Sequence, residues 1–400
     1  MRRNAIRILV YTTLFAVSGT SVLAQDGVQI VPDNAPTNDW FGTSVGIDED
    51  WIVVGAPGDV RGTLTGSVYV FDAASGNQLT QLTALDAEIR DCFGWSVDVS
   101  GNTAIIGANL DSAVEVCSGS AYLFDLATGS QLRKLNASDA TARDRFGQSV
   151  AISGNRAIVG APDDDYGIRT STGSAYVFDV TTGEQVCKLT ASDQTANAYF
   201  GDSVDICGNR AVVGTRSKYV SYLFDITTGE EIAKLTVDGC GIGPGVAISD
   251  NKIITSSTNL TSEPLAHLFN AITGEWLMEL RRPDVMAVDE KPTSKVAISG
   301  ELAVVQTARV SSNHYFFSNY VFDTNTGECL GRFTADDTSM EDPWVGSLAM
   351  EGNQIISGCS YFDDSGYVHV FTVPEPTVWG LLSSLLGFVM MRRSRLNKES

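Results

Sequence analysis

The sequence is poor in the residues on which many enzyme sites depend. Only three of its 400 residues are histidines, and its seven cysteines do not cluster, so it offers little for a zinc enzyme. It also lacks an excess of positive charge, since 27 Lys and Arg stand against 48 Asp and Glu, for a formal net charge of −21. Nucleic-acid binding depends on a basic surface, so this balance argues against a nucleic-acid partner.

Proline is scarce, with 11 residues, whereas glycine is common, with 38, and 43% of the residues are apolar. This composition is typical of a folded, turn-rich chain and not of collagen, a linker or a disordered protein. A chain of 400 residues could form two or three ordinary domains, but repeat folds of this size often form one body.

The first 24 residues have the pattern of a secretory signal peptide. Arg2, Arg3 and Arg7 precede a short apolar run that ends in small residues before Gln25. An uncleaved membrane anchor is the alternative, but the run is short for a span of about 20 residues. We therefore predict that residues 1–24 are a signal peptide and that the protein is exported.

The C-terminal end carries a second address signal. An apolar segment at residues 377–391 separates a Pro-Glu-Pro motif from a basic cluster. As a helix, it would reach roughly 22 Å, less than a hydrocarbon core of about 30 Å. The basic cluster should stay in the cytoplasm, which leaves everything before the segment outside. The motif and the cluster consist of Pro374, Glu375, Pro376, Arg392, Arg393 and Arg395.

This order of elements over residues 374–400 resembles the PEP-CTERM sorting signal of bacterial exosortase systems. The resemblance implies export, transient anchoring in the inner membrane by a short transmembrane helix, and processing near Pro-Glu-Pro. Release to the cell surface or an exopolysaccharide matrix would follow, with exosortase and the export machinery as partners. A plain C-terminal anchor is the alternative. Both ends are basic, so their removal would make the remaining surface more acidic still.

Between the ends, one motif occurs seven times. A Val landmark recurs at intervals of 42 to 54 residues and alternates with a Phe landmark. Regular recurrence at this period is the signature of a repeat architecture. The Val positions are Val45, Val97, Val150, Val204, Val246, Val296 and, as leucine, Leu348; the Phe positions are Phe71, Phe124, Phe178, Phe224, Phe269, Phe322 and Phe371.

Each unit has the pattern of four short strands. In the third unit, residues 149–152 and 157–161 flank a Ser-Gly-Asn turn that suits a tight hairpin. Residues 173–178 alternate small and aromatic side chains, which places Tyr176 and Phe178 on one face. Four antiparallel strands in about 50 residues predict an all-β fold, a seven-bladed β-propeller, with a β-solenoid as the structural alternative.

The propeller should occupy residues 25–373. Its last unit runs into the C-terminal signal without a fourth strand, whereas residues 28–31 align with the outer strand of the other units. We therefore predict that an N-terminal strand completes the last blade and closes the ring. The predicted blades lie near residues 40–85, 92–138, 145–192, 199–238, 242–281, 292–335 and 344–372, the last completed by 28–31.

Two recurring phrases resemble the FG-GAP repeat of integrin-type propellers. They stand as Phe41-Gly42 with Gly55-Ala56-Pro57 and as Phe146-Gly147 with Gly160-Ala161-Pro162, with weaker copies in units two and four. We expect the glycines to allow close approach of strands and the Phe to pack between blades. The resemblance covers residues 28–372. Units five to seven keep the spacing of the repeat but mostly lack the motif residues.

Calcium binding is usual in the integrin-type repeat but should not be carried over. The acidic loop that binds calcium there is cut here to three-residue turns such as Ser153-Gly154-Asn155. Calcium needs six to eight oxygens, which such turns cannot supply. We therefore expect no cofactor; acidic loops elsewhere are weak candidates for a metal, with solvated carboxylates as the alternative. The candidates are Asp163, Asp164, Asp165, Asp363 and Asp364.

No residue pattern indicates catalysis. His267 and His369 occupy the position that tyrosine holds in five other units, so we predict that they pack between blades, and His314 lies in a stretch predicted to be irregular. Some units also resemble the repeats of PQQ-type propellers, but only Trp276 stands near the place where that family puts a docking tryptophan. Among the cysteines, Cys92 and Cys117 fall in one unit and could form a disulfide after export.

We therefore predict an exported, non-catalytic propeller that binds extracellular polysaccharide or surface proteins and so mediates adhesion. A propeller enzyme, either quinoprotein-like or polysaccharide-active, with its site on one face is the alternative. A purely structural scaffold is a third possibility. The enzyme hypothesis requires a pocket that gathers carboxylates or histidines from several blades.

Overall fold

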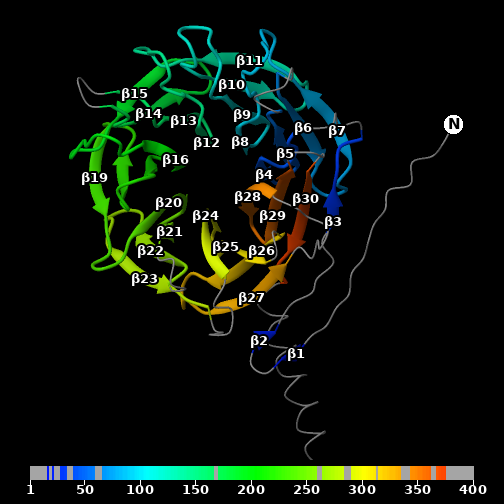
Figure 1. The fold of residues 1–400 in the computed structure, drawn as a ribbon, viewed down its shortest axis with the longest axis vertical. Helices are drawn as coiled ribbons and strands as arrows, with labels where there is room; N and C mark the ends of the chain where they lie inside the picture. The colour runs from blue at the N-terminus through cyan, green and yellow to red at the C-terminus, as the bar shows by residue number, and fades with distance from the viewer. Residues whose placement is uncertain are drawn as a thin grey trace, which may run out of the picture.

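The computed structural model describes residues 16–17, 20–21, 28–33, 39–58, 65–165, 170–258, 264–282, 290–311, 314–334, 343–361 and 366–374. Within these ranges every regular element is a strand. Seven four-stranded antiparallel sheets stand around a central channel, so the predicted seven-bladed β-propeller is confirmed (Figure 1).

Each blade starts with an inner strand at the channel and continues outward in chain order. The blades are numbered here by their inner strands, from β4 to β28. The first three blades are β4 (Ser44–Asp48), β5 (Trp51–Ala56), β6 (Ser67–Asp72) and β7 (Gln78–Leu82); β8 (Ser96–Ser100), β9 (Thr103–Ala108), β10 (Ser120–Asp125) and β11 (Ser130–Leu135); and β12 (Ser149–Ser153), β13 (Arg156–Ala161), β14 (Ser174–Asp179) and β15 (Gln185–Leu189).

The remaining blades follow the same order. They are β16 (Phe200–Cys207), β17 (Arg210–Thr215), β18 (Ser221–Asp225) and β19 (Glu230–Leu235); β20 (Ile242–Ser249), β21 (Lys252–Ser257), β22 (Ala266–Asn270) and β23 (Trp276–Leu280); β24 (Glu290–Ser299), β25 (Leu302–Ser311), β26 (His314–Asp323) and β27 (Cys329–Thr334); and β28 (Pro343–Glu351), β29 (Gln354–Tyr361) and β30 (Tyr367–Thr372) with β3 (Val28–Ile30).

The last blade is completed by the N-terminal strand, as the sequence predicts. β3 pairs antiparallel with β30, with Val28 opposite Val370 and Ile30 opposite Val368 (Figure 1). Ile30 is 3% exposed and packs in a cluster with Phe71 of blade one. The ring is therefore closed by non-covalent pairing between the two ends of the propeller sequence.

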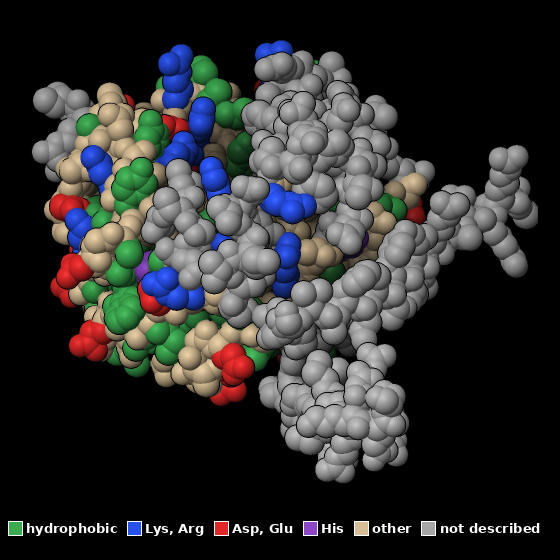
Figure 2. Space-filling model, turned by 60° about the horizontal axis from the view of Figure 1, so that its bottom comes forward, with side chains coloured by type: hydrophobic (Ala, Val, Ile, Leu, Met, Phe, Trp, Pro, Cys, Tyr) green, Lys and Arg blue, Asp and Glu red, His purple; other side chains and the backbone are tan. Residues whose placement is uncertain are grey.

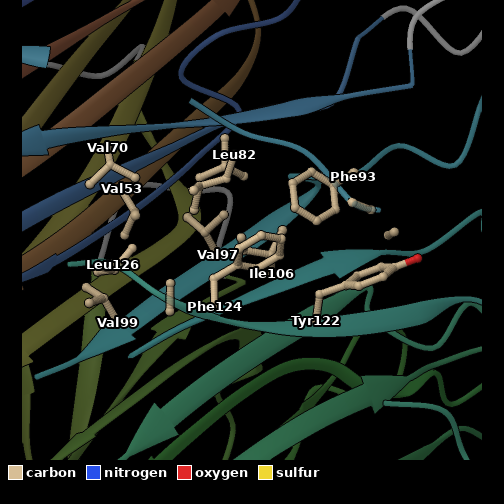
Figure 3. Packing of buried hydrophobic residues seen from close by; sticks show 14 residues of the cluster. Val53, Val70, Leu82, Phe93, Val97, Val99, Ile106, Tyr122, Phe124 and Leu126 are labelled. Atoms are coloured by element: carbon tan, nitrogen blue, oxygen red, sulfur yellow. The ribbon is translucent and has the colours of Figure 1, made fainter. Parts of the chain in front are cut away.

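Most of the hydrophobic core lies between neighbouring blades. Figure 3 shows one such layer, in which Val53 and Leu82 of blade one meet Val97 and Phe124 of blade two. The Phe of the Phe-Gly motif is central to these layers: the Phe93 ring lies 5.7 Å from that of Phe124 in an edge-on arrangement. The expected packing of this Phe between blades is confirmed, and it uses the geometry that aromatic pairs prefer.

The glycines of the two motifs contact each other across the blade boundary. Gly147 adopts a φ of +89°, which favours glycine. A Cβ atom on Gly160 would lie 2.0 Å from the backbone oxygen of Gly201, the Phe-Gly glycine of the next blade. No side chain fits at Gly147 or at Gly160. This explains why the Phe-Gly and Gly-Ala-Pro motifs recur together, one hairpin apart.

The hairpins between the first two strands of each blade also connect neighbouring blades. Gly154 takes the expected positive φ, +54°, and its N–H donates to Ser100 Oγ of blade two over 3.1 Å. The same bond joins Gly300 to Ser249 and Gly352 to Ser299, at 3.1 and 2.9 Å. The shortened turns thus connect blades at one end of the channel.

Blade six departs from the other blades in length. β24, β25 and β26 have ten residues each, and His314 pairs with Ser311 at the far end of the β25–β26 hairpin. The prediction of an irregular stretch around His314 is therefore wrong. That stretch continues a regular ladder, which is longer than the corresponding ladder of any other blade in the described ranges.

Outside the ring, β1 (Ala16–Val17) and β2 (Thr20–Ser21) form a small hairpin within the predicted signal peptide. In the part of the chain that the structure describes, no helix has the length and apolar character needed to cross a membrane. The apolar segment 377–391, Glu375 and Pro376 of the sorting motif, and Arg392, Arg393 and Arg395 lie outside the described residues, while Pro374 is the second residue after the end of β30.

Candidate functional site

The seven inner strands enclose a cavity of about 340 Å³ around the propeller axis. Every blade contributes to its lining through the residues around the Val landmark. Directly before that landmark, five blades carry serine and two do not. The serines are Ser44, Ser96, Ser149, Ser203 and Ser347, and the exceptions are Gly245 in blade five and Lys295 in blade six.

The cavity serines hold neighbouring blades together. Ser96 Oγ donates to the carbonyl oxygen of Gly147 over 2.9 Å, and Ser149 Oγ donates to that of Gly201 over 2.8 Å. The same bond joins Ser44 to Gly94 and Ser347 to Gly42. Because a hydroxyl has one proton and two lone pairs, these four side chains keep only acceptor capacity for a ligand.

Two cations and one carboxylate also line the cavity. Arg216 forms an ion pair with Asp202 of the same blade and lies 5.0 Å from the Tyr199 ring centroid. Lys295 has no ion-pair partner among the described residues. Desolvation lowers the pKa of the Lys295 ammonium, and the nearby Asp202 only partly opposes this.

Trp95 and Gln148 supply the remaining bulk of the lining. Each directly precedes the serine at which the inner strand of its blade begins. The Gln148 side chain is held by Asn109, whose amide donates to Gln148 Oε1 over 2.7 Å. The cavity therefore combines one aromatic surface, several acceptors and a local excess of one positive charge.

The charge of the surface is not uniform, despite the acidic composition. Figure 2 shows Lys and Arg side chains gathered over the middle of the viewed face, with Asp and Glu side chains mainly towards its lower edge. A local field of this kind can attract a small anion even to a protein whose overall charge is also negative.

The candidate metal ligands of blade three bind protein groups. Asp164 is buried, accepts a hydrogen bond from the Tyr176 hydroxyl over 3.1 Å and lies 2.7 Å from Lys188 Nζ. Asp163 pairs with Arg145 over 3.4 Å, and Asp165 accepts from the Ser171 N–H over 2.6 Å. Across the described ranges, no three His, Cys, Asp or Glu side chains are grouped to hold a metal ion. Asp363 and Asp364 lie outside the described residues.

The proposed disulfide is not present in the structure. Cys92 is buried at the entry of blade two, and Cys117 is half-buried in a loop of the same blade. The carbonyl oxygen of Cys117 accepts from the Arg145 N–H, which belongs to the connection into blade three. The Cys92–Cys117 pairing stays a prediction for the exported protein.

The structure shows a charged cluster that was not predicted. Lys188 Nζ lies 2.7 Å from both Asp139 and Asp164 and stacks 5.1 Å from the Tyr176 ring centroid. Burial alone would lower the pKa of Lys188, but its hydrogen bonds to the two carboxylates raise it. The same arrangement recurs around Lys134 in blade two and, with one carboxylate, around Lys234 in blade four. The sequence does contain a signal for this cluster, because a lysine directly precedes the last leucine in the outer strands of three successive blades.

The cluster predicts that Asp164 and Asp163, although adjacent in one loop, contribute differently to stability. Replacing Asp164 with alanine should lower the free energy of unfolding by about 2 kcal/mol, because the buried Tyr176 hydroxyl and Lys188 lose a partner. Asp163→Ala removes a partly exposed pair and should cost less than about 1 kcal/mol. Urea denaturation followed by tryptophan fluorescence measures both; equal losses would contradict the structural role of Asp164.

His267 lies in the core of blade five. Its side chain is fully buried, and neither ring nitrogen has a hydrogen-bond partner among the described residues. Thr255, opposite it on β21, has an equally unpartnered hydroxyl. Burial lowers the pKa of His267 to about 4, outweighing the attraction of Glu279. His267 is thus packed as a neutral ring at the tyrosine position.

This burial predicts acid sensitivity. The folded protein resists protonation of His267 until about pH 4, whereas the unfolded chain takes up the proton near 6.5. The stability present above pH 6.5 should therefore fall by roughly 3 kcal/mol as the pH drops to 4, in addition to losses from other groups.

The variant His267→Phe should lack this contribution. Its stability, measured by denaturant unfolding between pH 4 and 7, should decline less steeply than that of the wild type. His369→Phe in blade seven is the matched control and should keep the full decline, because His267 remains. A parallel decline in wild type and His267→Phe would contradict the assignment.

Comparisons with known proteins agree with this geometry. Seven four-stranded blades around a channel define the chain as a β-propeller. The FG-GAP repeat model matches residues 25–71, 77–124, 130–178 and 184–220. Each match begins near the outer strand of one blade and runs into the next, and the first includes β3. The protein is therefore a β-propeller, and four segments between residues 25 and 220 match the FG-GAP repeat model.

More distant comparisons show the fold alone. No curated protein matches the sequence. A chain in the crystal structure of the mitotic checkpoint complex is similar over 91% of this chain and 99% of its own length, with 16% identity and a TM-score of 0.52. Because 765 chains of solved structures match, the propeller itself selects no function.

The PQQ-type resemblance receives no support from Trp276. Its side chain is 49% exposed at the start of β23 instead of docked against a neighbouring blade. The first half of the chain matches the FG-GAP model instead.

Proposed function

We propose that this protein is an exported binding module that contacts polysaccharide or surface proteins through one end of its channel. The proposal rests mainly on the cavity at the centre of the ring. Residues from all seven blades line it, among them Trp95, Lys295 and several serines. Ligand pockets commonly combine an aromatic surface with a few placed polar groups in a preformed cavity. FG-GAP repeats, typical of extracellular proteins, support this setting.

The route to the surface is proposed from the two ends of the sequence. The signal-peptide pattern of residues 1–24 supports export, and the PEP-CTERM-like segment 374–400 supports sorting by an exosortase after transient anchoring. Fractionation of an exosortase-containing bacterium that expresses the full chain tests this route. Protein in the surface or matrix fraction is expected, and retention in the cytoplasm would contradict export. Exchanging Arg392, Arg393 and Arg395 for serine should impair sorting.

The binding proposal is tested on the exported protein. An array of neutral glycans, acidic glycans and extracellular proteins is probed in calcium buffer and again with a chelator. We expect binding that the chelator does not change, because the turns that would hold calcium in integrin-type repeats bind neighbouring blades here. Failure to bind any glycan or protein would contradict the proposal, and loss of binding with chelator would contradict its metal-free form.

A further inference from the structure

Lys295 in blade six replaces the channel serine with a charged residue, whereas blade five carries Gly245 at this position. In four other blades the aligned serine donates to the next Phe-Gly glycine. In blade six the same position carries a long cationic side chain that lines the cavity. A lysine here contributes no such bond, so its presence needs another reason.

The charges around the cavity compensate the Lys295 ammonium only in part. Asp202 is the acidic residue of the lining, and it is already bound to Arg216. Lys295 is half-buried, and partial removal of an ammonium from water without a full counter-charge is unfavourable, which agrees with the lowered pKa of Lys295. An anionic group bound beside Lys295 would offset this free-energy cost.

The rest of the lining restricts what carries that anion. Ser44, Ser96, Ser149 and Ser347 have spent their protons on backbone carbonyls, so they can accept hydrogen bonds but cannot bind an anion. They suit a ligand with several hydroxyl donors. Trp95 in blade two lies across the ring from blade six and offers an amphipathic ring face.

We propose that the channel cavity binds a uronic acid, that is, a sugar residue bearing one carboxylate. The carboxylate lies beside Lys295 and Arg216, the sugar hydroxyls donate to the cavity serines, and the ring packs near Trp95. A volume of about 340 Å³ is at the small end of ligand pockets, which fits the end of a glycan and not a chain threaded through. This inference rests on the proposed binding function and specifies its ligand.

The test is isothermal titration of the exported protein with methyl glucuronide and with methyl glucoside. The glucuronide should bind at least about tenfold more tightly, as expected for a charge-assisted bond. Lys295→Ser, which introduces the residue that five other blades carry, should remove this preference without unfolding the protein. Lys291→Ser is the matched control, because Lys291 lies on the same strand, is exposed and does not line the cavity.

The outcomes separate this inference from the function on which it rests. If the protein binds glycans or proteins on the array but Lys295→Ser leaves the glucuronide preference unchanged, the cavity assignment is wrong and the binding function stands. If the array shows no binding at all, the function itself fails. A short peptide with an acetylated N-terminus and a free C-terminal carboxylate serves as a non-sugar anion. If this peptide binds more tightly than methyl glucuronide, the assignment to a sugar is wrong.

Discussion

Replacing Ile30 with aspartate should open the propeller ring and lower the free energy of unfolding by about 4 kcal/mol. The side chain is 3% exposed between β30 and blade one, where a carboxylate would have no partner. β3 has only three residues, so the loss of this anchor should release the whole strand. Amide hydrogen exchange in β30 should rise as its outer neighbour leaves.

The matched control is Val28→Asp on the same short strand. Val28 is 45% exposed, so its replacement should change the unfolding free energy by less than about 1 kcal/mol. Both variants are compared by urea denaturation and by hydrogen exchange of β3 and β30. If Ile30→Asp unfolds at the wild-type urea concentration with unchanged exchange, pairing of the two chain ends does not hold the ring closed.

Gly160→Ala should be the second large effect, with a loss of about 3 kcal/mol. The added methyl would lie 2.0 Å from the Gly201 oxygen, and both groups are fixed in neighbouring blades. Relief requires the blades to move apart, which would also disturb the bond from Ser149 to Gly201. The expected result is a lower midpoint of urea denaturation.

Gly154→Ala provides the comparison within the same blade. Nothing lies within 4 Å of a Cβ atom at that turn, so only the positive φ of +54° opposes the substitution. We expect a cost of about 1 kcal/mol. A larger loss for Gly154→Ala than for Gly160→Ala would show that backbone strain, and not contact between blades, explains the glycines of the motif.

Much of the fold could be predicted because each blade repeats the same local solution. The Val landmark recurs where an inner strand lines the channel, and the Phe landmark recurs where a third strand packs against the preceding blade. Closure could be inferred because the last unit lacks a strand that residues 28–31 supply. The hairpin of β25 and β26 was missed because no other unit has such an extension to compare with.

The candidate site was harder to predict because its residues come from different blades. Trp95, Arg216 and Lys295 lie far apart in the sequence, and only the curvature of the ring brings them to one cavity. A run of acidic residues was more conspicuous in the sequence, yet Asp164 binds Lys188 and Tyr176 instead of a metal. A replaced serine at a repeat position was the better signal, and it appears only when the seven units are aligned.

The pairing of β3 with β30 has a consequence for how the protein is made. β3, the first strand of the propeller to emerge from the ribosome, finds its partner only after the last blade has been synthesised, so the final contact joins the most distant parts of the propeller sequence. A chain truncated in blade seven would leave β3 without its partner strand and would expose unpaired sheet edges. Such edges promote aggregation, and we expect the truncated chain to aggregate or to be degraded. Ring closure thereby distinguishes a completely synthesised propeller from a truncated one.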